Sequence, residues 1–316
     1  MAEDIEASGV CWTVMEPHAG DAARSLLPLR FLGAVHRWVL EGRLPRLARY
    51  YPSAGGIADP EAAWPAFVEA VEQNGEALGA SMPPTVQTNE VTRCCALLPG
   101  FLEIARRTGL PLRLLEIGAS AGLHLRWDYY RYETAGGGWG PAGSPVLFRG
   151  AFTGGPPLDT AVRVVERSGC DLNPVDVMTD DGRLTLLSFV WPDQAERFGN
   201  LSNAIQVARA VPAGLERADA MEWLGPRLAD PRTGVVTVVF HSITLLYFSG
   251  AARERVSQIL HEAGERATRE APLAWLSMEP GQQQTDVHLT VWPGGERRLI
   301  ATAGYHGRNV VCCSQE

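Results

Sequence analysis

Apolar residues in the first third of the chain recur at intervals of three and four, which is the spacing of one face of a helix. The pattern predicts helices over much of residues 21–109. Two stretches interrupt it, at 51–56 and 82–90, and both contain Pro. Since Pro and Gly disfavour the interior of a helix, we expect loops there. Positions that show the helical spacing are Leu26, Leu29, Leu32, Val35, Trp38, Trp64, Phe67 and Val71.

After residue 109 the pattern changes to short apolar runs, which end in Gly, Asp or Asn and alternate with helix-like segments. This alternation is typical of buried parallel strands joined by crossover helices. A last pair of runs, 287–292 and 298–303, is connected by Pro-Gly-Gly-Glu and predicts an antiparallel hairpin. The other predicted strands are residues 112–117, 162–170, a short stretch before Asp219, 235–241 and 273–278.

The two patterns together predict an α/β protein with two regions. We expect an N-terminal helical region over residues 1–109, which would act as a lid or substrate region, and a sheet domain over residues 110–316. The sheet should be mostly parallel, with the antiparallel hairpin at its C-terminal end. An insertion is expected near residues 127–160, and its Gly-rich stretch 136–143 reads as a surface loop.

Charge and cysteine content narrow the class of partner. The chain has 28 Lys and Arg against 36 Asp and Glu, a formal net charge of -8, and no long basic run, which disfavours nucleic acid. Its six cysteines have neither the spacing of a zinc site nor that of a disulfide framework. Because the start of the chain is acidic and no apolar run spans a bilayer, we expect a cytoplasmic protein. Since no feature indicates nucleic acid or membrane, we expect a small molecule as its partner. The oligomeric state stays open.

A loop of small residues follows the first predicted strand, in Leu-Leu-Glu-Ile-Gly-Ala-Ser-Ala-Gly-Leu at 114–123. Small side chains let a ligand approach the backbone, and the start of the next helix would present N–H groups to it. We therefore predict that this loop holds an adenosine-bearing cofactor. An ordinary strand-to-helix turn is the alternative. The predicted cofactor-binding residues here are Glu116, Gly118, Ala119, Ser120 and Gly122.

The spacing of this loop resembles the Glu/Asp-x-Gly-x-Gly-x-Gly loop of S-adenosylmethionine-dependent methyltransferases, with Ser120 at the central Gly. The resemblance implies a Rossmann-like class I methyltransferase sheet and S-adenosylmethionine as the cofactor. No metal is expected, because the histidines do not cluster.

The same resemblance implies roles for two later strand ends. Asp171, in Cys-Asp-Leu-Asn-Pro, matches the acid that holds the cofactor ribose, and Asn173 is a second candidate contact. Asp219 and Ala220 match the position that contacts the adenine amino group. Asp171 lies 55 residues after Glu116 rather than the ~20 of a compact unit, so its role depends on the predicted insertion.

Several stretches also resemble a family of bacterial proteins known only as a domain of unknown function. The resemblance extends over residues 31–308 and implies a fold more than a reaction. Residues 244–248, Thr-Leu-Leu-Tyr-Phe, depart from a more polar stretch in that family, which points to a specialised substrate. The matching stretches are residues 49–56, 86–91, 114–123, 169–174, 191–194, 239–242 and 303–308.

His241 is the predicted general base, because imidazole titrates near neutrality and the residue ends a strand at the ligand edge of the sheet. A hydrogen-bonded structural histidine is the alternative. Glu90 is a second catalytic candidate, and Arg93 is expected to pair with a carboxylate of the cofactor. Helix capping by residues 88–89 is the competing interpretation of that polar segment. The predicted substrate contacts are Asn89, Tyr51, Ser242 and Tyr247, with His306 and Glu279 as weaker candidates.

The sequence thus predicts an S-adenosylmethionine-dependent methyltransferase that acts on a small molecule. Methyl transfer needs few dedicated residues, because the donor is already activated and the protein mainly positions the acceptor. Two alternatives stay open. The same cofactor could serve aminocarboxypropyl transfer or a rearrangement, or the fold could be a non-catalytic binding module. A nicotinamide dehydrogenase is disfavoured, because residues 118–123 lack Gly-x-Gly-x-x-Gly.

Overall fold

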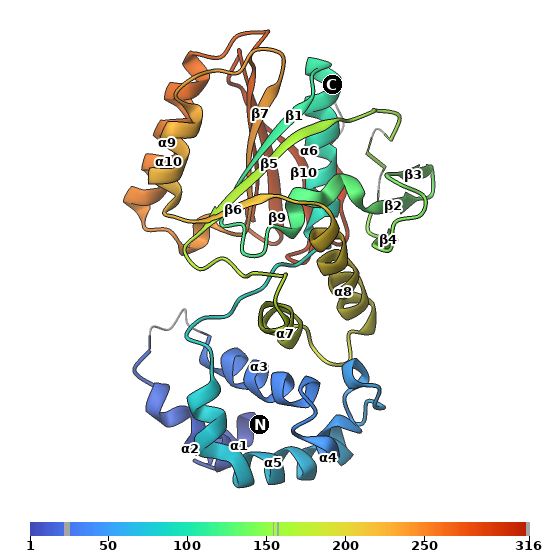
Figure 1. Ribbon diagram of the computed structural model, residues 1–316, viewed down its shortest axis with the longest axis vertical. Coiled ribbons are helices and arrows are strands. Elements are labelled where there is room, and N and C mark those ends of the chain that lie inside the picture. The colour runs from blue at the N-terminus through green and yellow to red at the C-terminus, as the bar shows by residue number, and fades with distance from the viewer. Residues whose placement is uncertain (22–25, 154, 157, 314–316) are drawn as a thin grey trace. The chain divides into compact units, whose positions relative to one another are not determined.

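A computed structural model describes residues 1–21, 26–153, 155–156 and 158–313 of the chain (Figure 1). The chain forms two compact units. Unit 1 comprises Met1–Thr88 and Val175–Ser202, and unit 2 comprises Asn89–Pro174 and Asn203–Glu316. Residues 154 and 157 of the predicted insertion lie outside the described residues.

Unit 1 is helical, as the spacing of its apolar residues predicts. One face of each longer helix enters a shared core that contains Phe31, Trp38, Leu47 and Val71. The two Pro-containing segments are not α-helical, although residues 51–56 include one short 3-10 helix, η3 (Pro52–Ala54). The other helices that the structure describes wholly within this unit are α1 (Ala2–Glu6), α2 (Val10–Met15), η1 (Glu16–His18), α3 (Leu27–Leu40), α4 (Pro45–Ala48), α5 (Pro60–Ser81) and α7 (Asp180–Ser188).

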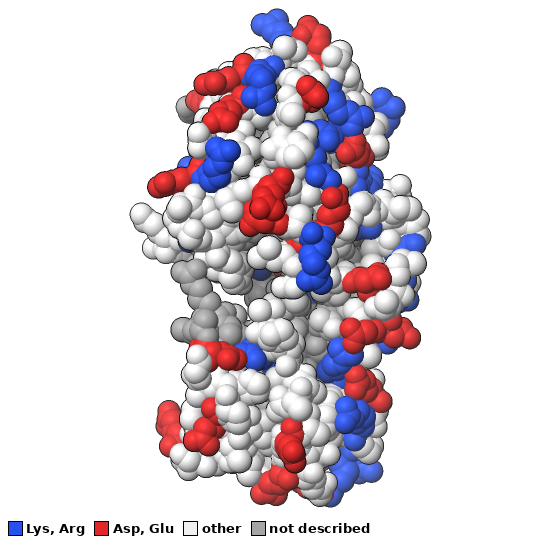
Figure 2. Space-filling model, turned by 60° about the vertical axis from the view of Figure 1, so that its left-hand side comes forward, with Lys and Arg blue, Asp and Glu red and all other residues white. Residues whose placement is uncertain are grey.

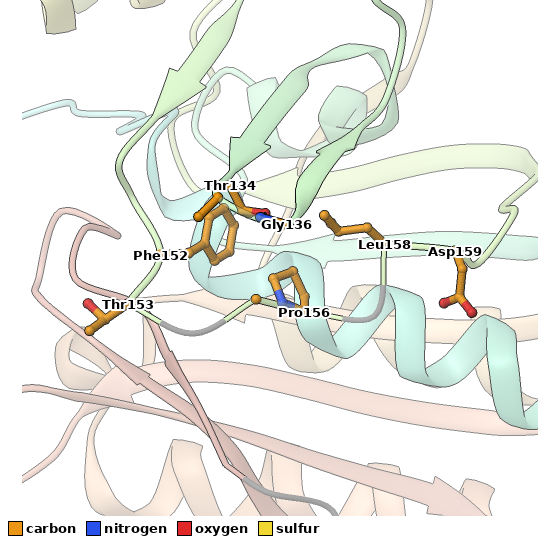
Figure 3. A pocket seen from close by; sticks show the side chains of 9 residues that line it. Thr134, Gly136, Phe152, Thr153, Pro156, Leu158 and Asp159 are labelled. Carbon is orange, nitrogen blue, oxygen red and sulfur yellow. The ribbon is translucent and has the colours of Figure 1, made fainter.

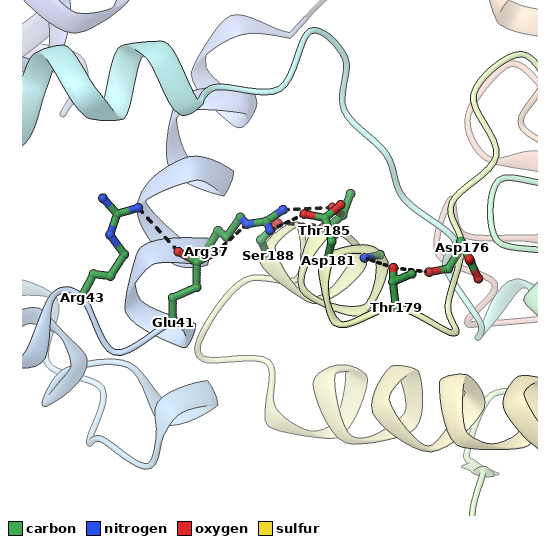
Figure 4. A network of polar contacts seen from close by, with 9 residues as sticks. Arg37, Glu41, Arg43, Asp176, Thr179, Asp181, Thr185 and Ser188 are labelled. Carbon is green, nitrogen blue, oxygen red and sulfur yellow. Dashed lines mark hydrogen bonds and ion pairs between the residues drawn. The ribbon is translucent and has the colours of Figure 1, made fainter.

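Helix α7 belongs to unit 1 although it lies about a hundred residues further along the chain than the other helices. Arg37 on α3 binds Asp181 on α7 through an N–O contact of 2.6 Å and the hydroxyl of Thr185 at 3.2 Å (Figure 4). The same guanidinium donates to Glu41 at 2.8 Å. Sequence periodicity did not predict this connection, because no local pattern records which helices pack together.

His36 joins α3 to two other parts of unit 1. Its Nδ1 lies 3.0 Å from the carbonyl oxygen of Ser188, and its Nε2 lies 2.7 Å from the hydroxyl of Ser53. Since a carbonyl only accepts, Nδ1 carries the proton and Nε2 accepts from Ser53. Burial of the ring lowers the pKa of His36 to about 4.

We expect this histidine to make unit 1 sensitive to acid. Between pH 6.5 and 4, His36 is protonated in the unfolded chain but stays neutral in the folded protein. The contribution of His36 to the stability of unit 1 is therefore complete above pH 6.5 and is lost progressively as the pH falls toward 4. The loss amounts to roughly 3 kcal/mol, from about 1.4 kcal/mol per pKa unit. Hydrogen exchange of the α3 amides across this pH range measures it. A His36→Gln variant should lack this component, and an unchanged acid response in that variant would contradict the assignment.

Unit 2 is built on an eight-stranded sheet in the order β11-β10-β9-β8-β7-β1-β5-β6 (Figure 1). The strands from β6 to β8 run parallel, and the remaining neighbours pair antiparallel. All the predicted strands and the closing hairpin are therefore confirmed. The strands are β1 (Leu112–Ile117), β5 (Val164–Asp171), β6 (Gly214–Arg217), β7 (Val236–Ser242), β8 (Leu273–Pro280), β9 (Thr285–Trp292), β10 (Arg297–Ala303) and β11 (Val311–Cys312).

Helices cover both faces of this sheet. Helix α6 (Arg93–Thr108) packs against β8, β9 and β10, while α10 (Gly250–Glu265) lies beside α9 (Ala220–Leu228) on the other face (Figure 1). Helix α8 (Ala195–Ala210) follows α7. The sequence predicted a single boundary at residue 109, whereas the chain passes between the two units at residues 88, 174 and 202. Helix α6 therefore belongs to unit 2, where its apolar face packs against the sheet.

The segment between β1 and β5 differs from the sequence prediction in two ways. The loop after β1 leads into a 3-10 helix, η4 (Leu123–Tyr129), rather than an α-helix. The predicted insertion then forms a second sheet of β2 (Arg131–Thr134), β3 (Gly137–Trp139) and β4 (Leu147–Arg149). The Gly-rich stretch 136–143 is thus not only a loop. The ring of Trp139 in this stretch stacks on the ring of Trp127, with 5.0 Å between the ring centroids. This contact stabilises strand β3 despite the glycines.

Charged side chains of both signs are interspersed on the face shown in Figure 2. Elsewhere among the described residues, charged side chains form ion pairs whose place in this view is not labelled, such as Arg46 with Glu69 and Arg149 with Glu133. Across the residues that the structure describes, no helix has the length and apolar character needed to cross a membrane.

Candidate functional site

The carboxyl ends of the parallel strands form the candidate site of unit 2. From β1 the chain continues to β5 and β6 on one side, and then returns to β7 and β8 on the other. Open α/β sheets bind ligands where the strand order reverses in this way, at the carboxyl ends. Two turns lie at that point, residues 118–122 after β1 and residues 243–245 after β7.

The turn after β1 has the left-handed backbone that its small residues permit. Gly118 and Gly122 each have φ of 65°, and Ser120 has φ of 50°. Non-glycine residues rarely adopt this conformation unless surrounding contacts enforce it. Here the contact is Asp171, whose Oδ2 accepts the Ser120 N–H at 2.8 Å.

Asp171 lies beside this turn because β5 pairs with β1 up to Cys170. Its Oδ1 accepts the N–H of Asn173 at 2.8 Å. The side-chain oxygen of Asn173 in turn accepts from Arg217 at 2.7 Å. Each carboxylate oxygen of Asp171 therefore holds one backbone N–H, which fixes the turn and leaves each oxygen further acceptor capacity.

The turn after β7 packs directly onto Gly118. A Cβ atom at Gly118 would lie 2.3 Å from Cγ2 of Thr244, so this glycine is required by packing as well as by its φ. Ile243, the preceding residue, has φ of 51°. Such a backbone is an outlier for a β-branched residue, and outliers of this kind gather at functional sites.

The structure places His241 in the protein interior, fully buried at the end of β7. The indole N–H of Trp275 donates to His241 Nε2 at 3.0 Å, so the proton of the neutral ring is on Nδ1. This Nδ1–H donates to Oε1 of Glu279 at 2.7 Å. Both ring nitrogens are therefore used inside the protein, which favours the structural alternative for His241 over the predicted general base.

Glu279 clamps the turn after β7. Its Oε1 also accepts the backbone N–H groups of Thr244 at 2.9 Å and Leu245 at 3.0 Å. Burial raises the pKa of this carboxyl, but the hydrogen bonds from His241 and the two N–H groups outweigh burial and lower it. Glu279 is thus a carboxylate that positions the turn, a role that the sequence did not reveal.

Glu116, predicted to contact the cofactor, is buried behind the turn and binds His124 instead. Its Oε1 is 2.9 Å from His124 Nδ1, and His124 Nε2 donates to the backbone oxygen of Glu90 at 2.9 Å. Burial raises the pKa of Glu116, against the lowering effect of His124. Oε1 of Glu116 is therefore used by His124, whereas its Oε2 is buried without a hydrogen-bond partner among the described residues.

The polar segment before α6 is bound to the same turn. The side-chain oxygen of Asn89 accepts the N–H of Leu123 at 2.8 Å, which caps the 3-10 helix η4. Glu90 accepts the N–H of Thr92 at 3.2 Å at the start of α6. The alternative interpretation, in which residue 88 or 89 is the N-cap of the following helix, is wrong, because the N-cap of α6 is Thr92 and Asn89 binds η4 instead. The N–H of Leu123, one of those that the helix start was expected to present to a ligand, is thus taken by Asn89.

Arg93 connects the segment after β10 to the end of β7 at the candidate site. Its Nε donates to the backbone oxygen of Tyr305 at 3.1 Å, and its terminal nitrogen to that of Ser242 at 3.4 Å. His306 Nδ1 is 3.7 Å from Oε2 of Glu90. Because residues 305 and 306 follow an antiparallel hairpin, their distance from the site could not be judged from sequence.

Asp219 and its neighbours form the edge of the site at β6. Asp219 caps α9, where its Oδ1 accepts the N–H of Met221 at 2.8 Å and Ala220 begins the helix. Leu172, which was not predicted, is 65% exposed beside Asp171. Its backbone oxygen accepts from Arg217 at 3.1 Å, which places it next to the segment that leads to Asp219. The only sequence signal was one apolar residue inside Cys-Asp-Leu-Asn-Pro.

The two predicted tyrosines differ in their surroundings. Tyr247 lies in η5 (Leu245–Tyr247), directly after the clamped turn, and is 59% exposed. Tyr51 lies in unit 1 instead, where its ring is 5.5 Å from that of His36 and burial raises its pKa to about 12. The structure therefore groups Tyr247 with the candidate site and gives Tyr51 a packing role within unit 1.

A separate cavity of about 430 Å³ lies beside the second sheet of unit 2 (Figure 3). It is lined by Thr134, Phe152 and Leu158, with Asp159 at one side. Asp159 interacts with Arg106, near the C-terminal end of α6, which leads into the amino end of β1.

Residues 1–311 match the family described as "Uncharacterized protein conserved in bacteria (DUF2332)". The chain belongs to this family. The resemblance to an uncharacterised bacterial family is thus confirmed over nearly the complete sequence. No curated protein and no solved structure matches the chain. Within the described part of the chain, no group of three or more His, Cys, Asp or Glu side chains is arranged to hold a metal ion.

Proposed function

We propose that the protein is an S-adenosylmethionine-dependent methyltransferase that acts on a small molecule, with the cofactor held at the carboxyl ends of β1, β5 and β6. The observation that carries the proposal is the arrangement of Ser120, Asp171 and Asp219 around the point where the strand order reverses. The left-handed turn after β1 is held by Asp171 at the end of β5, and Asp219 follows β6.

These residues fit the adenosine half of such a cofactor. Carboxylates accept hydrogen bonds from ribose hydroxyls and from the adenine amino group, and both acids retain acceptor capacity beyond their backbone contacts. The exposed side chain of Leu172 supplies an apolar surface for a flat base between them. Half-buried Arg93, the first residue of α6, reaches the end of β7 with its side chain and suits the carboxylate of the methionyl part.

When bound, the cofactor would supply an activated methyl group, so the residues of this chain mainly bind and orient. The turn at 118–122 and the clamped turn at 243–245 pack against each other, and donor and acceptor would meet next to them. Rigid turns of this kind pre-organise reactants, which is the main contribution that such a transfer needs. His241 maintains one side of this arrangement through Glu279 and is not assigned a proton-transfer role.

Calorimetric titration with S-adenosylmethionine, S-adenosylhomocysteine and NAD tests the proposal. We expect both sulfur ligands to bind and NAD not to. Leu172→Asp, which places a charge where the base would lie, should weaken binding at least tenfold, since burying an unpaired charge costs more than about 1.4 kcal/mol. Leu299→Asp changes an equally apolar exposed residue on β10 and should leave binding unchanged.

A second variant separates binding from folding. Asp219→Asn retains a good helix cap but replaces one carboxylate oxygen by an N–H donor, which would oppose the adenine amino group. We expect weaker binding with an unchanged melting temperature. If the folded wild-type protein binds neither sulfur ligand, the methyltransferase proposal is abandoned. If it binds them and product analysis shows no methylated acceptor, another use of the cofactor or a non-catalytic module replaces it.

A further inference from the structure

Unit 1 contains a groove of about 700 Å³ that is open to solvent. It is bordered by α5 and by the segment of α2 and η1, and α2 packs against α5 (Figure 1). This volume is in the range of sites that hold small molecules. Its apolar lining consists of Val10, Val14, Pro17, Val71, Gly75, Gly79, Ala80 and Met82. Its polar lining consists of Thr13, His18, Glu72 and Glu76.

Two glycines on α5 form part of the floor of this groove. Gly75 and Gly79 are four residues apart, so they lie on the same face of the helix. A Cβ atom at Gly75 would lie 3.1 Å from Cγ2 of Val14, and one at Gly79 would lie 3.6 Å from its Cγ1. Glycine destabilises the interior of a helix relative to alanine. Helix α5 therefore includes two unfavourable residues on the face that borders the groove.

Two acids share this face of α5. Residues 72, 75, 76 and 79 have the spacing of one helical face, so Glu72 and Glu76 are next to the glycines. Both side chains are exposed, and neither has an ion pair or a hydrogen bond with any residue that the structure describes. Like charges four residues apart destabilise a helix. The groove thus combines an apolar floor with two negative charges that no described residue neutralises.

We propose that this groove binds a small amphiphilic cation, with its apolar body on the glycine floor and its ammonium or guanidinium group beside Glu72 and Glu76. The apolar lining would supply most of the affinity, because the gain from burial scales with apolar area. The carboxylates would mainly select the charge, since exposed ion pairs are weak. Departures from local sequence rules, such as those on α5, are typical of functional positions. The site lies wholly within unit 1 and does not depend on the proposed methyl transfer.

Nuclear magnetic resonance of the ¹⁵N-labelled full chain, titrated with decylamine below its micelle concentration, tests the site. We expect the amide signals of Gly75 and Gly79 to shift saturably, while that of Gly264 on α10 stays. Decyl sulfate has the same alkyl chain with the opposite charge and should bind about tenfold more weakly. Added salt should weaken the binding of decylamine, because it screens exposed charges. Equal affinity for decylamine, decyl sulfate and decanol would overturn the proposed selection of a cation.

The charge is tested separately with a double variant. Glu72→Gln with Glu76→Gln should lower the affinity for decylamine about fivefold, as expected from the loss of two exposed charge contacts, and leave that for decanol unchanged. Glu254→Gln with Glu265→Gln on α10 makes the same change in net charge away from the groove and should leave both affinities unchanged. An unchanged decylamine affinity in the first variant would contradict the role of the two acids.

The position is tested by filling the groove. Ala80→Trp adds a large side chain to the lining and should abolish decylamine binding, whereas Ala77→Trp, exposed on the same helix but outside the lining, should not. Binding that survives Ala80→Trp, or a wild-type protein whose Gly75 and Gly79 signals do not respond to decylamine, would overturn the inference. Signals of these glycines that change with protein concentration alone would show that a second copy of the chain occupies the groove instead.

Discussion

Replacing Glu279 by alanine is expected to destabilise unit 2 by about 4 kcal/mol, the range for breaking a buried, hydrogen-bonded charged group. The variant leaves the His241 Nδ1–H and the N–H groups of Thr244 and Leu245 without their acceptor. Hydrogen exchange of the β7 and β8 amides measures the loss within unit 2. Protection close to that of the wild type would show that the clamp does not hold the turn.

Glu279→Gln is the matched control, because its amide oxygen can still accept from the three donors. We expect a smaller loss at neutral pH and a different response to acid. The folded pKa of Glu279 is lowered, so its stabilising effect is present above the ordinary pKa of the unfolded chain and disappears as pH falls through the folded value. The Gln variant lacks this titration, so its stability relative to the wild type should improve in acid.

Gly118→Ala is expected to cost about 4 kcal/mol, from about 1–2 for the left-handed backbone and up to about 3 for overpacking. The new methyl group would lie 2.3 Å from Cγ2 of Thr244 at a φ of 65°. Calorimetric unfolding measures the loss. Gly109→Ala is a close control, because Gly109 has the same φ and an added Cβ would meet nothing within 4 Å. That variant should lose only the about 1–2 kcal/mol that an alanine in the left-handed backbone costs.

Thr244→Ala should rescue Gly118→Ala in part, since it removes the methyl group that collides while leaving the backbone N–H for Glu279. A double-mutant cycle then gives the coupling between the two turns. We expect the double variant to recover the overpacking part and to retain the backbone part. Strict additivity of the two single variants would mean that the turns do not constrain each other.

The predicted site residues are mostly brought together by the fold, but their roles differ from those expected. Asp171 and Asp219 lie at the predicted strand ends because parallel strands in one sheet end at one edge. Glu116 and His241 are also at that edge, yet their side chains bind His124, Glu279 and Trp275. Sequence pattern locates the end of a strand, whereas the direction and partner of a side chain depend on residues far away in the chain.

The sequence by itself determined the strands of the main sheet, its closing hairpin and the helical character of unit 1, since periodicity and breakers act locally, but it did not reveal β2, β3 and β4. It also determined the turn after β1, because only small residues allow its left-handed backbone. Tertiary structure alone decided that α6 belongs to unit 2 and α7 to unit 1. It also decided that Thr244 fills the space at Gly118 and that His306 lies next to Glu90. These contacts join residues far apart in the chain, and their geometry follows from packing that no local pattern encodes.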